Sequence, residues 1–343
     1  KELSPWLSEC PSQILRNSAV NWYQTYQKFM SGKCGRPKRK PKTDKGSIYL
    51  TREVFRFDHC DDGNVRLFIG TKTNNIGYLS FKAHGKFEIP NSLYVRKERG
   101  HYYVSFCYEQ GQPDRKLSTN EEHLAFLQGA TREYLEEHTM GVDRGVAIPV
   151  CAGEQTYDFT HSQKKNMSKA DRYIKRLQRK LARQQKGSNR RAKTKHRIAV
   201  HHAKKANIRN DFAHKTSRLL VDSSAKIIVF EALRTARMTR RPKAKQDEQG
   251  RFISNKAKQK AGLNKSILNV GWHVIETYTY YKAYSSSKAV FKIPAPTTSQ
   301  ECAKCGHTHP DNRKTQALFV CGNCGNTDNA DHNASLVIKK RAI

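Results

Sequence analysis

The stretch that decides the fold runs from Ser299 to Ile338 and reads SQECAKCGHTHPDNRKTQALFVCGNCGNTDNADHNASLVI. Fifteen residues separate its two Cys-x-x-Cys pairs, whose members are Cys302, Cys305, Cys321 and Cys324. Two thiolates at this spacing can turn toward one ion, and two such pairs complete a tetrahedral shell of four sulfurs. Because the intervening length suits a β-hairpin, we expect a zinc ribbon over residues 301–325 that holds one structural Zn2+. Four unrelated buried cysteines, or two disulfides, are the alternative.

Three isolated acidic residues stand at the junctions of expected elements. Asp331 follows the ribbon where a terminal helix should begin, so it is either a helix cap or a metal-binding carboxylate. Asp143 lies inside the apolar, strand-like segment MGVDRGVAIPV, and Glu231 lies near the end of the short buried strand AKIIVFEAL. A carboxylate in a buried strand is costly unless a metal or a cation balances its charge. For Asp143 the alternative partner is the neighbouring Arg144.

If these acids meet across one sheet, they form a site for metal-dependent chemistry. Three carboxylates can hold two Mg2+ ions, one of which activates water while the other stabilises the leaving oxygen of a phosphodiester. Mg2+ prefers such hard oxygen ligands and keeps coordination sites for water and phosphate. From residue 139 onward, the expected order of strand, strand, basic helices, strand, helix, strand and helix is that of an RNase H-like fold.

The composition points to a polyanionic partner. The chain has 64 Lys and Arg residues against 30 acidic residues, a net charge of +34, so we expect it to bind nucleic acid. An anionic membrane is the rival partner, but no apolar run approaches the roughly 20 residues of a spanning helix. Nine cysteines, five of them outside the ribbon, favour a reducing compartment and hence a cytoplasmic, nucleoid-associated protein. Since the chain begins at Lys1, we expect an N-terminal piece to be missing.

Two stretches carry most of this positive charge. Residues 164–215 contain nineteen Lys or Arg and two acids, with apolar residues at helical spacing, which predicts two long helices broken at Lys186-Gly187-Ser188-Asn189. This surface either faces a nucleic-acid duplex, which we favour, or is a solvated helical hairpin. Residues 35–42 contain prolines that forbid a helix and form either a linker or a phosphate-contacting arm. The expected nucleic-acid-binding residues are Arg36, Lys38, Arg39, Lys40, Lys175, Arg176, Arg179, Lys180, Arg183, Arg190, Arg191, Lys195 and Arg197.

The whole chain is therefore expected to be a multidomain α+β protein. Alternating apolar residues between turn signals predict a small antiparallel β-barrel or sandwich over residues 46–111. Residues 120–138 are expected to form one helix within an acidic linker. The expected boundaries are 1–45 for a helix with a basic linker, 46–111 for the β-domain, 112–138 for the acidic linker, 139–300 for the α/β core, 301–325 for the ribbon and 326–343 for the terminal helix.

Several segments resemble one known family. GVDRG, IIVFEALR, ILNVGWHVIETYTYYKA, TTSQECAKCGHTHPDNRKTQALFVCGNCG and NADHNASLVI look like the split RuvC motifs and zinc ribbon of TnpB, a transposon-encoded family ancestral to the compact type V CRISPR effectors. The likeness covers residues 140–343, and residues 1–110 only loosely. By resemblance, Asp143, Glu231 and Asp331 match the catalytic acids and the four cysteines match the ribbon ligands. The β-domain would be a wedge-like barrel, and residues 1–45 the end of a helical recognition lobe.

The resemblance implies an RNA-guided, Mg2+-dependent DNA endonuclease that carries two catalytic Mg2+ ions and one structural Zn2+. Its expected partners are a guide RNA and a target double-stranded DNA beside a short adjacent motif, no membrane is expected to take part, and the sequence allows a monomer. The acidic segment 112–138 is longer than the usual link between barrel and nuclease. Two alternatives stand beside this interpretation: a catalytically silent RNA-guided or DNA-binding regulator, and a guide-independent RNase H-like nuclease.

Overall fold

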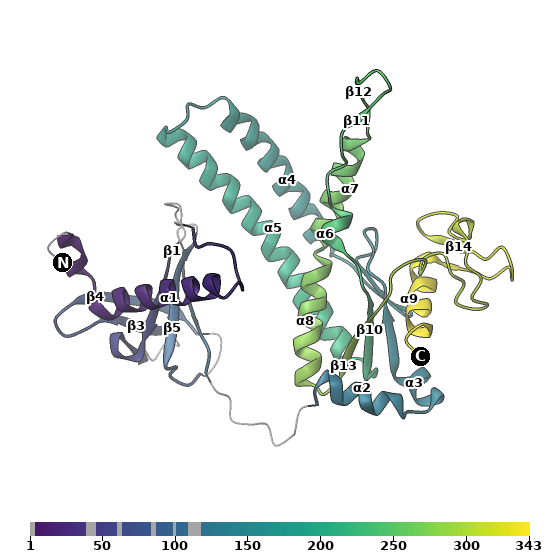
Figure 1. Ribbon diagram of the computed structural model, residues 1–343, viewed down its shortest axis with the longest axis horizontal. Helices are drawn as coiled ribbons and strands as arrows, with labels where there is room; N and C mark the ends of the chain where they lie inside the picture. The colour runs from purple at the N-terminus through teal and green to yellow at the C-terminus, as the bar shows by residue number, and fades with distance from the viewer. Residues whose placement is uncertain (1–3, 39–45, 60–63, 84–86, 99–100, 109–117) are drawn as a thin grey trace. The chain divides into compact units, whose positions relative to one another are not determined.

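The computed structural model describes residues 4–38, 46–59, 64–83, 87–98, 101–108 and 118–343. The backbone divides into two compact units, Lys1–Asp114 and Arg115–Ile343, each of which has its own core (Figure 1). None of the helices in the described ranges is both long enough and apolar enough to span a membrane.

The N-terminal unit is one helix packed on short antiparallel strands. The helix α1 (Ser12–Met30) follows a 3-10 turn, η1 (Pro5–Glu9), and buries Ile14 in a core shared with the strands. The other elements are β1 (Gly46–Thr51), η2 (Arg52–Val54), β2 (Phe55–His59), β3 (Asn64–Gly70), β4 (Asn75–Lys82), β5 (Ser92–Glu98) and β6 (His101–Phe106). Residues along β3 alternate between exposed and buried positions, as the period of two in the sequence predicted.

The strands of this unit form two sheets and not the predicted closed barrel. Within the described ranges, one antiparallel sheet has the order β1-β5-β6 and the other the order β2-β3-β4. Their buried faces share one apolar core, at whose centre Leu50, Leu67 and Leu93 are completely or almost completely buried. The sandwich alternative therefore describes the unit better than the barrel, because the two sheets meet through side chains and not through backbone pairing.

The C-terminal unit is built on a parallel three-stranded sheet. The strands β7 (Thr139–Val142), β10 (Ile227–Glu231) and β13 (Ala289–Ile293) lie in the order β13-β10-β7. All five residues of β10 are buried. At the end of β7, Asp143 forms an antiparallel bridge with Cys151 of β8 (Val150–Ala152), which pairs in turn with β9 (Gln155–Tyr157).

Helices cover both faces of this sheet. Successive side chains of β10 point to opposite faces, and all of them are buried, so each face must be covered. Ile228 and Phe230 pack against α5 (Asn189–Asp222) and α8 (Trp272–Ser285) on one face. Ile227 and Val229 face Ile338 of α9 (Ala330–Lys340), together with residues of α2 (Asn120–Gln128) and α3 (Arg132–His138). The sheet therefore forms the middle layer of a mixed α/β unit (Figure 1).

The acidic segment contains two helices where one was predicted. They are α2 (Asn120–Gln128) and α3 (Arg132–His138). Gly129 caps the end of α2, and the Thr131 hydroxyl then accepts a hydrogen bond from Tyr134 N at 3.3 Å, which starts α3. Both helices contribute leucines to the sheet core, so the described part of this segment, from residue 118, covers the sheet. Residues 112–117 lie outside the described residues.

The remaining elements follow the predicted order. The basic helices are α4 (His161–Ala182) and α5, and the break between them ends at Ser188, whose hydroxyl caps α5. After β10 come α6 (Thr235–Met238), the hairpin β11 (Lys245–Gln246) and β12 (Phe252–Ile253), and α7 (Ala257–Val270). The cysteine-rich segment contains η3 (Pro310–Asn312) and the antiparallel pair β14 (Leu318–Val320) and β15 (Thr327–Asn329).

Candidate functional site

The three isolated acids come together at one edge of the parallel sheet. Asp143 directly follows β7, and Glu231 is the last residue of the neighbouring β10, so the parallel strands bring both to the same end of the sheet. Asp331 lies in the first turn of α9, which packs on β7. This close approach requires Gly141, because a Cβ there would lie 2.1 Å from Ser335 O of α9.

Asp331 is not the cap of its helix. The Asn329 side chain performs that role and accepts hydrogen bonds from Asp331 N at 2.9 Å and His332 N at 3.2 Å. The Asp331 carboxylate is buried and accepts a hydrogen bond from Arg313 Nη2 at 2.9 Å. The geometry therefore favours the second interpretation of Asp331, a metal-binding carboxylate, over the first, a helix cap.

The negative charges of Glu231 and Asp331 act on Asp143. Burial raises the pKa of Asp143 to about 7, and the negative charges of Glu231 and Asp331 add to the increase. Burial also raises the pKa of Glu231, although the Thr298 hydroxyl, which donates a hydrogen bond to Glu231 Oε1, opposes the increase. A buried carboxyl group whose pKa is raised by neighbouring acids gains from a cation, so this donor set of hard oxygens fits Mg2+.

Arg144, the alternative partner of Asp143, is occupied elsewhere. Its side chain is buried, and Nη1 donates to Glu276 Oε2 of α8 at 2.7 Å, while Nη2 donates to the backbone oxygen of Glu231. Arg144 therefore fixes the end of β10 and pairs with a different carboxylate. Asp143 keeps its own carboxylate for the cluster.

Two residues at this cluster were missed by the sequence reasoning. Arg313 reaches Asp331 from the cysteine-rich segment, and Thr298 reaches Glu231 from the loop after β13. Both contacts join segments that are distant in sequence. The stretch containing Arg313 was quoted as part of the ribbon, but no local spacing marks this arginine as a neighbour of an acid in the next helix.

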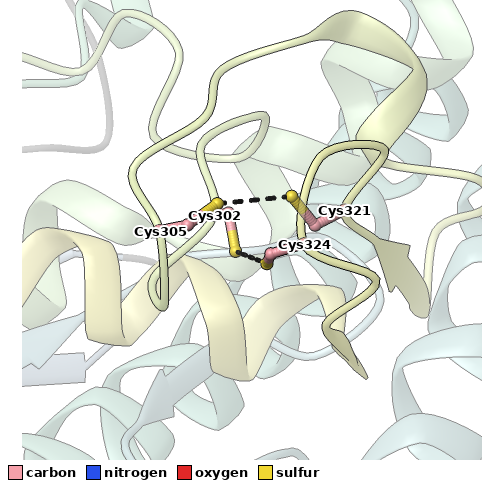
Figure 2. A group of neighbouring side chains, drawn as sticks. All are labelled: Cys302, Cys305, Cys321 and Cys324. Carbon is pink, nitrogen blue, oxygen red and sulfur yellow. Dashed lines mark hydrogen bonds between the residues drawn. The ribbon is translucent and has the colours of Figure 1, made fainter.

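The four cysteines form the strongest candidate metal site (Figure 2). Among the described His, Cys, Asp and Glu residues they are the one group whose ligand atoms all lie within 4.8 Å of one another. The Sγ–Sγ distances are 3.7 Å for Cys302–Cys324 and 3.6 Å for Cys305–Cys321. Four sulfurs about 2.3 Å from a tetrahedral Zn2+ lie about 3.8 Å apart, whereas a disulfide requires about 2.05 Å. The geometry fits zinc and excludes two disulfides.

Each cysteine pair folds around the metal position in the same way. Gly306 and Gly325 directly follow the second cysteine of each pair, with φ of 76° and 69°, and each donates its N–H to the first cysteine's carbonyl. The backbone N–H of His307, together with the neighbouring thiols, lowers the pKa of Cys305 to about 6. A thiolate is therefore available for a metal at neutral pH.

The ribbon is joined to the helix that carries Asp331. Asn333 of α9 is completely buried; its Oδ1 accepts from Ala303 N at 3.0 Å and its Nδ2 donates to Glu301 O at 2.7 Å. Both partners flank Cys302. The first cysteine pair and the first turn of α9 are thus held by one side chain.

The predicted nucleic-acid-binding residues lie mainly on exposed surface. Those that are exposed are Arg36, Lys38, Lys175, Arg176, Arg179, Lys180, Arg183, Arg190, Lys195 and Arg197. Arg191 is half-buried and donates to the carbonyls of Leu181 and Gln184, so it closes the end of α4. Arg39 and Lys40 lie outside the described residues. A hollow of about 600 Å3 between α4 and α5 brings Arg176, Lys180, Arg183 and Arg197 together.

Two family models match this chain. The Cas12f1-like TNB domain matches residues 272–338, and the OrfB_IS605 family, described as "Probable transposase", matches residues 105–241. The first matched region contains the four cysteines and Asp331, and the second contains Asp143 and Glu231.

Two curated relatives and one solved structure are similar to this chain. InsQ of Escherichia coli K12, named as a candidate RNA-guided DNA endonuclease, is 29% identical over 96% of this chain and 74% of InsQ. The CRISPR-associated endodeoxyribonuclease Cas12f1 of Sulfoacidibacillus thermotolerans is 27% identical over 73% of this chain and 53% of its own length. The alignment with a Cas12f1–sgRNA–target DNA complex covers 92% of this chain and 75% of the Cas12f1 chain at 13% identity, with a TM-score of 0.41.

Proposed function

We propose that this chain, which resembles the TnpB family of transposon-encoded proteins, is an RNA-guided DNA endonuclease. Its RuvC-type site would consist of Asp143, Glu231 and Asp331, which would hold two Mg2+ ions. A guide RNA would pair with the target strand of a double-stranded DNA, next to a short adjacent motif. The observation that carries the proposal is the convergence of three acids from β7, β10 and α9 on one sheet edge.

The electrostatics of this cluster support catalysis more than passive binding. Buried carboxylates such as Asp143, whose pKa is raised by burial and by the charges of Glu231 and Asp331, are costly without a cation, and a protein that only binds nucleic acid has no need of them. When bound, the two Mg2+ ions would supply an activated water and neutralise the leaving oxygen of the phosphodiester. A catalytically silent regulator is therefore the weaker proposal.

The surrounding residues would orient the cluster. Thr298 holds the Glu231 carboxylate in one orientation through its hydroxyl. Arg144 fixes the backbone at the end of β10, and it packs its guanidinium 4.9 Å from the centre of the Phe230 ring. Arg313 places a positive charge beside Asp331, where it would also attract the phosphate of an incoming strand.

The remaining parts of the chain would supply nucleic-acid binding and support. The exposed cations of α4 and α5 would face the guide heteroduplex and bind its backbone through distributed phosphate contacts. The two sheets of the N-terminal unit would serve as the wedge-like domain, with α1 as the end of a recognition lobe. The zinc ribbon would position α9 and so complete the acid cluster. We keep the proposed domain boundaries at residues 45, 111, 138, 300 and 325.

The proposal is tested by purifying the protein from its host and sequencing any RNA that accompanies it. The complex is then incubated with Mg2+ and a plasmid that carries a sequence complementary to this RNA. We expect cleavage at that sequence, none with a scrambled plasmid, and none with the matched variant Asp143→Ala, which should retain its RNA. Cleavage without RNA would favour the guide-independent nuclease, and bound RNA without cleavage would favour the silent regulator.

A further inference from the structure

A large basic groove lies between α4, α5 and α7. Its volume is about 1340 Å3, and its walls come from these three helices and from the segment after α6. Seven lysine and arginine side chains line the groove, whereas Asp171 is the only acid among the described residues that line it. None of the residues singled out from the sequence lines it except Lys175. The site of the three carboxylates shares no residue with it.

Lys205 and Lys265 already pair with both carboxylate oxygens of Asp171. Lys205 is buried, and its Nζ lies 2.6 Å from Asp171 Oδ1 and 3.2 Å from Asn269 Oδ1. The Nζ of Lys265 lies 2.9 Å from Asp171 Oδ2. These pairs hold the three helices together at the base of the groove. Asp171 is therefore not available to neutralise the other cations of the groove.

Arg209 of α5 is the most informative of these cations. Its side chain is half-buried, yet its guanidinium makes no hydrogen bond or ion pair with any residue in the described part of the chain. Burial lowers its pKa, and the charge of Asp171 only partly opposes this effect. A half-buried guanidinium without a partner is costly in a free protein, and a bound phosphate would relieve that cost.

Three more cations of the groove also lack a partner among the described residues; they are Arg172, Lys175 and Arg241. A second unsatisfied group lies in the wall: the amide of Asn264 donates Nδ2 to Thr239 O at 2.8 Å, which leaves its buried Oδ1 without a hydrogen bond. Apolar surface is also present, since Leu268 lines the groove and is 58% exposed. The unpaired cations can bind the phosphates of a nucleic-acid strand, and Leu268 offers apolar surface beside them.

We infer that this groove binds the phosphodiester backbone of a single nucleic-acid strand, with Arg209 as the central phosphate contact. The inference rests on the proposed function, because it names a second place where that function's RNA or DNA is held. A groove of this kind tracks a single strand, whereas the exposed outer surface of α4 and α5 suits a duplex. The guide RNA and the displaced DNA strand carry the same phosphodiester chemistry, so the experiment must distinguish them.

The test uses the full chain, freed of RNA, and two labelled single strands of the same sequence, one RNA and one DNA. Binding is titrated across about 50 to 200 mM salt, the range over which salt competes strongly with bound phosphates. Arg209→Gln should weaken binding about tenfold or more, as expected for one charged hydrogen bond. It should also reduce the slope of log affinity against log salt by about 0.7 for each phosphate that is no longer bound. The strand whose binding weakens is the occupant.

Arg218→Gln is the matched control. Arg218 lies on the same helix but outside the groove, where it pairs with Asp222 at 2.6 Å, so its removal should leave affinity and slope close to those of the unmodified chain. Arg209→Gln should not lower the thermal unfolding temperature, because it removes a half-buried charge without a partner. An unchanged affinity and slope, or an equal weakening in both variants, would overturn the groove assignment while the proposed function stood. If the unmodified chain binds neither strand, the proposed function falls as well.

Discussion

Replacing Asp143 by Asn should stabilise the protein in the absence of Mg2+, and more so at neutral or alkaline pH than at acidic pH. The pKa of Asp143 is raised from 3.8 to about 7 in the folded chain. In the unfolded chain the carboxyl loses its proton near pH 4, so the unfolded state binds fewer protons and stability falls as the pH rises from about 4 to 7. A tenfold change in proton affinity corresponds to about 1.4 kcal/mol, so the full cost above pH 7 is about 4 kcal/mol.

The measurement is urea unfolding of zinc-loaded, magnesium-free protein at pH 5 and pH 8. Trp272 is the natural reporter, since its Nε1 donates to Gly145 O at 2.9 Å, two residues from Asp143. The other tryptophans, Trp6 and Trp22, belong to the N-terminal unit and can be replaced by Phe in every variant compared. The gain in unfolding free energy for Asp143→Asn should be about two to three times larger at pH 8 than at pH 5.

Adding Mg2+ should reverse the order of stability at pH 8. The unmodified chain gains the binding energy of the metal, whereas the variant lacks one of the ligands. Asp311→Asn serves as the control, because Asp311 is an exposed aspartate of the ribbon, away from the cluster. The contrary results are that the variant destabilises the magnesium-free chain at pH 8, or raises its unfolding free energy equally at both pH values. Either result would show that the pKa of Asp143 is not raised by burial and by the neighbouring acids, and would remove the support for the metal assignment.

Three further predictions concern other parts of the chain. Cys321→Ser should release the zinc measured by elemental analysis and loosen the ribbon, while Cys107→Ser, at an exposed free cysteine, should retain it; zinc-free yet folded and active protein would contradict the ribbon. The double reversal Arg179→Glu with Arg183→Glu should weaken duplex binding for every sequence and reduce the salt slope by about 0.9 for each phosphate that is no longer bound; an unaltered slope would make this surface a scaffold. Gly141→Ala should push α9 off the sheet, cost about 3 kcal/mol in unfolding free energy and abolish cleavage; normal activity would show that the helix can move without harm.

The cysteine arrangement was predictable because its information is local. Two Cys-x-x-Cys pairs specify their own turns, and the glycine after each pair supplies the positive φ that the turn needs. The basic helices were predictable for the same reason, since the break at Ser188 carries its own capping hydroxyl. Each of these features depends on residues that lie within a few positions of one another.

The features that were missed depend on distant segments. Alternation along β3 fixes which side chains are buried but not which strand edges pair, so a closed barrel and two packed sheets fit the same pattern. The contact between Arg313 and Asp331 arises only when the ribbon folds back onto α9. The split of the acidic segment was readable in principle, because Gly129 followed by Thr131 is a stop signal and then a start signal.

The contact of Asn333 with the first cysteine pair has a consequence for the order in which the protein is made. Asp143 and Glu231 leave the ribosome well before the ribbon and α9, and until those arrive the sheet face at Gly141 has no cover and the third acid is absent. A nascent chain, or one cut short before residue 326, would expose its basic surfaces without a complete set of carboxylates. If the chain is the proposed endonuclease, its activity would thus be withheld during synthesis, before a guide RNA could restrict it.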